Sequence, residues 1–369
     1  MKKAFLLKKS GFVALLILVL AAAFLLSCGH KDEKVIIGAI LPLSGPASFV
    51  GEELRDGLMM AAKELNENGG INGKIIDIVI ENAAGDKDAP EKAFNKIMAL
   101  SPLVIVTGTS SVSGVVAPLA EKNKEFMTAL VATAPDLTKN REWVYRYWPT
   151  AEHEAPPMAD IFQKLGKESF GIIYVDDAYG KSVFGDLCKR MKGQNVQIIS
   201  SAFPLSENDF MKYARLVYST GAVAIIGFDT HVVKILKALK EIHYSGALLS
   251  TTTGTLPTIR KNPESDGMLV STTAIYNENY SFINEVKSRY QKLYQKEFTQ
   301  YSANGYDFLK LLIGLMEDKE MSKDTVKSLF EKGFLYSGVF GNIELTAGHH
   351  DIFFPLFPAR IENGKIQYR

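Results

Sequence analysis

Three serines stand close together where a run of apolar residues gives way to a helical pattern. Ser110, Ser111 and Ser113 follow the buried-strand pattern of residues 103–106 and precede an apolar helical segment that continues to residue 119. Serine hydroxyls at a helix N-terminus can cap the free backbone N–H groups, and together with those N–H groups they can bind an anion such as a carboxylate. Taken alone, these residues support capping and anion binding equally, so both interpretations stay open.

The common motifs of nucleotide-binding and nucleophilic enzymes do not occur in the chain. No Gly-x-Gly-x-x-Gly follows the first predicted strand, no Gly-x-x-x-x-Gly-Lys-Ser/Thr is present, and Ser110 and Ser111 are not part of a Gly-x-Ser-x-Gly turn. These absences argue against an enzyme, and we expect no catalytic residue and no cofactor.

Two histidine clusters are the candidate metal sites, and neither has favourable spacing. His349 and His350 adjoin an aspartate in a glycine-bounded loop, but the side chains of neighbouring residues point apart. His153 lies between Glu152 and Glu154 near the middle of the chain. We expect both clusters to be solvated, and we predict no metal site.

The N-terminus has the pattern of an export signal. Four lysines precede an apolar run over residues 12–26, and no acidic residue occurs before Asp32. The run ends in Leu25-Leu26-Ser27-Cys28, which resembles the bacterial lipobox. We predict a signal peptide over residues 1–27, a lipid on Cys28 and a polar tether over 28–34. An uncleaved membrane anchor is the alternative. Only one other cysteine, Cys188, is present, so a lipidated Cys28 would leave no intrachain disulfide.

The rest of the chain alternates short β-branched runs with amphipathic helical segments. This alternation begins at residue 35, starts again after a bridge that ends near residue 149, and gives way to longer helices from about residue 279. Alternating strands and helices predict parallel sheets covered by helices on both faces, and two such series predict two α/β lobes. The 42 Lys+Arg and 41 Asp+Glu leave a formal charge of +1, so no basic excess points to nucleic acid.

Several stretches, in order along the chain, resemble the type I periplasmic binding proteins of the branched-chain amino acid ABC transporter family, which includes the leucine/isoleucine/valine-binding proteins. The resemblance covers essentially everything after residue 34. Its most specific stretches are IGAILPLSGP at 37–46, LNENGGING at 65–73, GTSSVS at 108–113, TAPDLT at 133–138, YVDDAYG at 174–180, Asp209-Phe210 and GVFGNI at 338–343.

The resemblance implies an α/β fold of two Rossmann-like or flavodoxin-like lobes joined by three crossovers. One lobe would comprise residues 35–149 and 276–336, and the other 150–275 and 337–369. A small ligand would bind in the cleft at the carboxyl ends of the strands, and a hinge motion would close the lobes over it. The implied function is that of an extracytoplasmic, lipid-anchored substrate-binding protein that delivers an amino acid or a related small carboxylate to the permease of an ABC importer.

The resemblance also implies a set of ligand-binding residues. A serine of the 110–113 loop, with Ser111 preferred to Ser113, and Thr133 would hold a carboxylate. The carbonyl of Val131 and the side chain of Tyr179 would face an amine, and aromatic walls are expected from Phe49, Phe228, Tyr276 and Tyr301. The predicted site comprises Ser110, Ser111, Ser113, Val131, Ala132, Thr133, Tyr179, Phe228, Asp229, Thr252, Tyr301 and Phe49.

The chain departs from the family pattern at one position. The acidic residue of the family would fall within Thr251-Thr252-Thr253-Gly254, which contains no carboxylate. Asp229, at the end of the preceding strand, is the nearest substitute, although an aspartate there is often a helix cap. Either Asp229 replaces the missing anion, or the ligand lacks an α-ammonium group.

The resemblance leaves a second function open. A sensory or regulatory lipoprotein could share this fold and dock to a receptor instead of a permease, because the fold alone does not decide function.

Overall fold

The computed structural model describes residues 33–193 and 195–369. The predicted signal peptide and the predicted lipidation site Cys28 lie outside the described residues. None of the helices in the described part of the chain combines the length and the apolar character needed to cross a bilayer.

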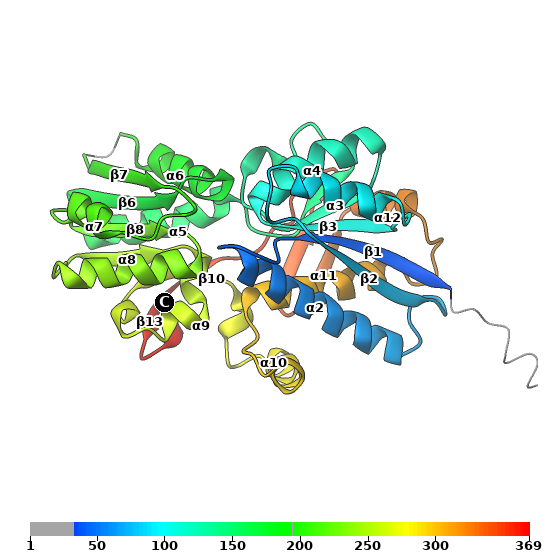
Figure 1. Cartoon of the computed structure of the whole chain (residues 1–369). Helices are drawn as coiled ribbons and strands as arrows, with labels where there is room; N and C mark the ends of the chain where they lie inside the picture. The colour runs from blue at the N-terminus through cyan, green and yellow to red at the C-terminus, as the bar shows by residue number, and fades with distance from the viewer. Residues whose placement is uncertain (1–32, 194) are drawn as a thin grey trace, which may run out of the picture.

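The first lobe is built on a parallel five-stranded sheet with the order β2-β1-β3-β4-β5. Helices α3 and α4 cover one face, and α2 and α11 cover the other (Figure 1). The strands are β1 (Lys34–Leu41), β2 (Ile75–Asn82), β3 (Val104–Gly108), β4 (Met127–Val131) and β5 (Val144–Arg146). The helices are α2 (Ser48–Glu67), α3 (Ala89–Met98), α4 (Ser110–Asn123), η1 (Pro135–Leu137), α10 (Ser281–Tyr294), α11 (Gln300–Met316) and α12 (Lys323–Glu331).

The second lobe contains a seven-stranded sheet with the order β14-β13-β10-β9-β8-β6-β7. Its strands are β6 (Ser169–Val175), β7 (Gln197–Phe203), β8 (Ala222–Ile226), β9 (Ala247–Ser250), β10 (Leu269–Thr272), β13 (Phe357–Glu362) and β14 (Lys365–Tyr368). Its helices are α5 (Ala151–Leu165), α6 (Ala178–Met191), α7 (Met211–Val217), α8 (Asp229–Glu241), η2 (Thr252–Thr255), α9 (Pro257–Arg260), η3 (Pro263–Ser265) and η4 (Ala274–Tyr276).

Both lobes share one strand order. Strands β6 to β10 are parallel and follow the same second-first-third-fourth-fifth sequence as β1 to β5. This is the flavodoxin-like order, in which ligands bind at the carboxyl ends of the strands where the order reverses. The predicted fold class, two flavodoxin-like α/β lobes, is confirmed.

The chain passes between the lobes three times. It leaves the first sheet after β5, enters the second lobe at α5, and returns after β10 to place α10 to α12 against the first lobe (Figure 1). After the antiparallel hairpin of β11 (Phe334–Gly338) and β12 (Gly341–Leu345), it closes the second sheet with β13 and β14. The turn between these last strands is Asn363-Gly364, both with positive φ, as a two-residue hairpin loop of type I′ requires.

One apolar core extends through the junction of the lobes. It joins residues of α2 and α11 to residues of α7 and α8, and the aromatic residues of the crossovers lie between them. Tyr147 packs edge-on against Phe308 and Phe354, with ring centroids 5.4 and 5.0 Å away. The hydroxyl of Tyr147 donates to buried Asp307 at 3.1 Å. These contacts hold the segment between β5 and α5 in place beside the cleft.

Candidate functional site

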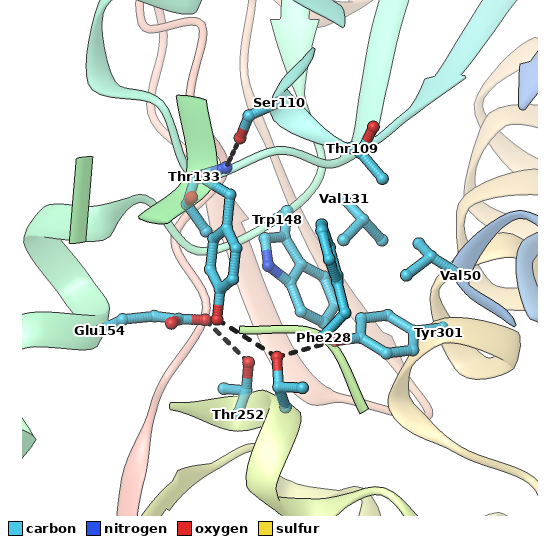
Figure 2. A pocket seen from close by; sticks show the side chains of 12 residues that line it. Val50, Thr109, Ser110, Val131, Thr133, Trp148, Glu154, Phe228, Thr252 and Tyr301 are labelled. Atoms are coloured by element: carbon cyan, nitrogen blue, oxygen red, sulfur yellow. Dashed lines mark hydrogen bonds between the residues drawn. The ribbon is translucent and has the colours of Figure 1, made fainter. Parts of the chain in front are cut away.

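A small cavity of about 30 Å³ lies between the lobes at the carboxyl ends of both sets of strands. Both lobes line it, as Figure 2 shows. Its lining residues are Val50, Thr109, Ser110, Val131, Thr133, Trp148, Glu154, Tyr179, Phe228, Thr252, Thr253 and Tyr301.

One end of the cavity presents hydroxyls at the start of a helix. Ser110 is the first residue of α4, and its Oγ accepts hydrogen bonds from the backbone N–H of Thr133 at 3.0 Å and of Ala134 at 3.3 Å. Both of these bonds use the oxygen as acceptor, which leaves the hydroxyl hydrogen to donate. The first N–H groups of α4 have no partner within the helix, and the helix dipole favours an anion there. This end of the cavity is suited to a carboxylate.

A buried arginine fixes the loop that carries Thr133. The guanidinium of Arg146 donates to the carbonyls of Ala132 at 3.1 Å and Ala134 at 2.7 Å, one on each side of Thr133. Its Nε donates to Asp351 at 2.9 Å, which supplies the counter-charge that a fully buried cation requires. The hydroxyl of Thr133 then lies 3.4 Å from that of Ser182, a residue of α6 in the opposite lobe.

The residue before α4 has an unusual backbone conformation. Thr109 has φ 67° and ψ 151°, and it lies in the cavity wall. This region of φ/ψ space is almost restricted to glycine, and a β-branched residue there stores roughly 1–3 kcal/mol of strain. Strain of this kind is concentrated at binding sites, so its position here supports the assignment of the cavity as the functional site.

Aromatic rings form the apolar wall. Trp148 is 1 % exposed and packs against Tyr301 with ring centroids 5.7 Å apart. Phe228 and Tyr179 face each other at 5.8 Å from the opposite lobe. The hydroxyl of Tyr301 lies 3.3 Å from that of Thr253, so the aromatic wall also bridges the two lobes. These side chains suit the apolar part of a small ligand.

A single carboxylate lines the cavity. Glu154, in the first turns of α5, is 1 % exposed, and its Oε1 accepts from the hydroxyl of Thr252 at 2.8 Å (Figure 2). Its Oε2 is buried and has no hydrogen-bond partner. Burial raises the pKa of Glu154 to about 7, and the bond from Thr252 opposes this shift. A buried acceptor without a partner is costly, so Oε2 is available for a donor supplied by a ligand.

The start of α5 holds Glu154 in place. The hydroxyl of Thr150 lies 2.8 Å from Nδ1 of His153 in a capping box. Pro156, inside the helix, has no N–H to offer the carbonyl of Glu152, and Arg190 of α6 donates to that carbonyl at 2.9 Å instead. The helix therefore keeps a defined path past the cavity.

Seven of the residues predicted from the sequence lie in the wall of this cavity. They come from both lobes and include the threonine expected to hold a carboxylate. They are Ser110, Val131, Thr133, Tyr179, Phe228, Thr252 and Tyr301.

The other two serines of the loop lie outside the cavity. Ser113 is fully buried on the inner face of α4, and its hydroxyl lies 2.8 Å from that of Thr107. Ser111, which the resemblance favoured, is exposed and donates weakly, at 3.5 Å, to Asp177 across the mouth of the cleft. Ser111 is turned about 100° away from Ser110 around the helix axis, whereas Ser113 lies nearly one turn further along α4, where it meets Thr107 instead of the cavity.

Asp229 is not in the cavity wall. It is the first residue of α8, and its Oδ1 accepts from the N–H of Thr230 at 2.6 Å. Phe49 stands behind the wall, where it packs edge-on against Phe228 and Tyr301. Ala132 is buried with the α3 and α4 side of the first sheet. Tyr276, also expected in the aromatic wall, lies in a separate surface hollow.

Five lining residues were not predicted from the sequence: Val50, Thr109, Trp148, Glu154 and Thr253. We expected Glu154 to be solvated together with Glu152 and His153, and this was wrong. The sequence did carry a signal that Glu154 is buried. Glu154 follows Ala151 by three residues and precedes Met158 by four, so it lies on the apolar face of α5. Trp148 carried no comparable signal. No cluster of three or more metal-ligating side chains occurs among residues 33–193 and 195–369.

Comparisons with known proteins agree with this architecture. The model of a family described as periplasmic binding protein matches residues 34–365. A Leu/Ile/Val-binding protein homolog 7 of Brucella suis biovar 1 is 28% identical over 225 residues, which are 57% of this chain and 56% of that protein. The alignments thus span about half the length of the curated relatives. The leucine binding protein LivK of Thermotoga maritima superposes with a TM-score of 0.82 at 20% identity, covering 91% of this chain and 97% of that one. A solute binding protein of Rhodopseudomonas palustris BisB5, in complex with 3,4-dihydroxy benzoic acid, gives 0.82 at 16% identity, covering 91% and 95%. At these identities the structures show the shared fold.

Proposed function

Because the chain belongs to the type I periplasmic binding protein family, of the branched-chain amino acid type, we propose that it binds a small carboxylate-bearing solute between its lobes and presents it to an ABC importer. The solute is an amino acid of the branched-chain type or a related acid. The chain itself makes and breaks no covalent bond.

The observation that carries this proposal is the cavity between the lobes, one end of which presents hydroxyls and a helix N-terminus. Ser110, Thr133 and the free N–H groups of α4 converge on that end, and aromatic side chains line the remainder. A carboxylate placed there would receive hydroxyl and amide hydrogen bonds in a site largely removed from water, where such bonds are strong.

Closure of the lobes follows from the same residues. Two of the hydrogen bonds between the lobes at the cavity are long, Thr133 to Ser182 at 3.4 Å and Tyr301 to Thr253 at 3.3 Å, and one, from Nε2 of Gln300 to the carbonyl of Thr252, is short at 2.7 Å. A ligand that bonds to both walls would add the interactions that hold the lobes together. The closed form would then differ in surface from the open form, and a permease that recognises only the closed form would receive loaded protein.

The proposal places the protein on the extracytoplasmic side of a bacterial membrane. A lipid on Cys28 would hold it there, and residues 28–34 would separate the lobes from the bilayer. Mass spectrometry of the protein extracted from cell membranes would detect a diacylated cysteine as the N-terminal residue. An unmodified Cys28 would remove this part of the proposal.

A thermal-shift screen tests the binding function. A ligand present at 100 times its Kd stabilises the native state by about 2.7 kcal/mol, which corresponds to a rise in Tm of roughly 5 °C.

We expect Ser110→Ala to weaken the affinity of the stabilising carboxylate by at least tenfold, because it removes a donor from the anion-binding end. Ser111→Ala, at the exposed neighbour, is the matched control and is expected to change affinity less than twofold. Equal effects of the two variants would contradict the assignment of this end of the cavity.

A further inference from the structure

The cavity contains a carboxyl group whose charge nothing in the described residues balances. No salt bridge in residues 33–193 and 195–369 includes Glu154, and the only hydrogen bond to its carboxyl group comes from the hydroxyl of Thr252. A buried carboxylate is stable as an anion only beside a cation or several donors. Glu154 is therefore either protonated, or it requires a positive group beside it to be stable as an anion.

The elements packed around Glu154 bring no cation to it. Tyr179 of α6 and Tyr301 of α11 are the titratable groups that face it, and burial raises the pKa of both phenols, so they stay neutral. Strand β10 and helix η2 contain no ionisable residue. Strand β13 contains one cationic residue, Arg360, and its guanidinium is paired with the carboxylate of Glu362 at 3.9 Å.

The ionisable neighbours on α5 itself are also turned to other partners. His153 is bound to Thr150, and Glu152 is exposed. A positive group at Oε2 must therefore come from the ligand.

We propose that Glu154 selects the ligand: it ionises to pair with a cationic amine on the bound carboxylate, and it stays protonated when the ligand has no amine. This inference rests on the proposed function and names the substrate class of the same site. Glu154 thus takes the place of the acidic residue that is absent from Thr251-Thr252-Thr253-Gly254, and its bond to Thr252 connects it to that segment.

The two binding modes have opposite pH dependences. Binding of an ammonium group requires the anion, so the proton on Glu154 leaves to solvent, and affinity rises with pH. Because burial raises the pKa of free Glu154 to about 7, the ionised fraction grows about tenfold between pH 6 and pH 8. A ligand without an amine requires the protonated form, so its affinity falls by a similar factor over the same range.

Calorimetry with matched ligand pairs tests the inference. The probes are L-leucine with 4-methylpentanoate and L-phenylalanine with 3-phenylpropanoate, which within each pair differ only in the amino group. The purified protein, Glu154→Gln and the exposed control Glu152→Gln are titrated at pH 6 and pH 8. We expect the wild type and Glu152→Gln to bind the amino acid of one pair at least about 100-fold more tightly than its partner at pH 8. Glu154→Gln is expected to lose this preference and its pH dependence.

The outcomes separate this inference from the function on which it rests. Equal affinity of the wild type for both members of a pair, or a preference that Glu154→Gln leaves intact, overturns the role of Glu154 while the binding function stands. Binding of neither member of either pair removes the proposed function and this inference with it. Far-UV circular dichroism of Glu154→Gln verifies that the variant is folded, and tighter binding of the deaminated acids by this variant would support the inference independently.

Discussion

The ligand-free protein should become more stable when Glu154 loses its charge. Burial raises the pKa of Glu154 from its ordinary value of 4.5 to about 7 in the folded state, whereas the unfolded chain keeps the ordinary value. The folded state is thus favoured at low pH, and this contribution is lost as pH rises from about 4.5 to 7. A difference of 2.5 pKa units corresponds to about 3 kcal/mol.

The substitution Glu154→Gln removes this dependence while it keeps the shape of the side chain and an acceptor for Thr252. At pH 8 we expect the free energy of unfolding to rise by as much as about 3 kcal/mol, and Tm to rise by roughly 5 °C. At pH 5 the gain should be below about 1 kcal/mol, because the wild-type carboxyl is then protonated in the folded state. Glu152→Gln, at an exposed residue of the same helix, should give no difference between the two pH values.

Urea denaturation of ligand-free protein, followed by circular dichroism at both pH values, measures the effect. A Glu154→Gln variant that is equally destabilised at pH 5 and pH 8 would refute the reasoning, because it would mean that Glu154 makes favourable contacts as an anion. The measurement needs no knowledge of the ligand, so it is independent of the calorimetric test above.

Further predictions concern packing, strain and the site. Gly57→Ala should cost about 3 kcal/mol or more, because the added Cβ would lie 2.0 Å from the carbonyl oxygen of Ser302, where α2 crosses α11. Gly314→Ala, in open space on α11, should instead raise stability by about 0.5–1 kcal/mol; urea midpoints compare the two, and similar losses would show that the close crossing is not the cause. Thr109→Gly should increase the free energy of unfolding by about 1 kcal/mol by relieving its positive φ, and a loss of stability would mean that its side-chain packing is worth more than the strain. Asp229→Asn should change amino-acid affinity less than twofold, since Asp229 lies outside the cavity wall; a tenfold loss by calorimetry would return it to the site.

Much of the fold could be predicted because it depends on local patterns. The alternation of β-branched runs with amphipathic helices indicated parallel sheets, and the restart near residue 150 indicated a second lobe. Asn-Gly is a local signal for a two-residue hairpin loop, and Asn363-Gly364 joins β13 to β14 in this way. Patterns of this kind are repeated over whole elements, so single exceptions do not obscure them.

Individual site residues were harder to predict because they depend on direction within one helical turn. The sequence placed three serines at the start of α4, but only Ser110 faces the cavity, and Ser113 is turned into the core. The family pattern pointed to Asp229 as the substitute acid because Asp229 is near the expected position along the chain. Proximity along the chain carries little information about a site assembled from two lobes.

The sequence by itself determined the two-lobed α/β architecture and the segment that carries the hydroxyls proposed to bind an anion, since both follow from periodicity and from residues adjacent in the chain. Only the tertiary structure decided which carboxyl group belongs to the cavity. Glu152 and Glu154 are two residues apart and chemically identical, and helical geometry turns them about 200° apart. The packing of α5 against α6 and β10 of its own lobe leaves one exposed and buries the other beside Thr252.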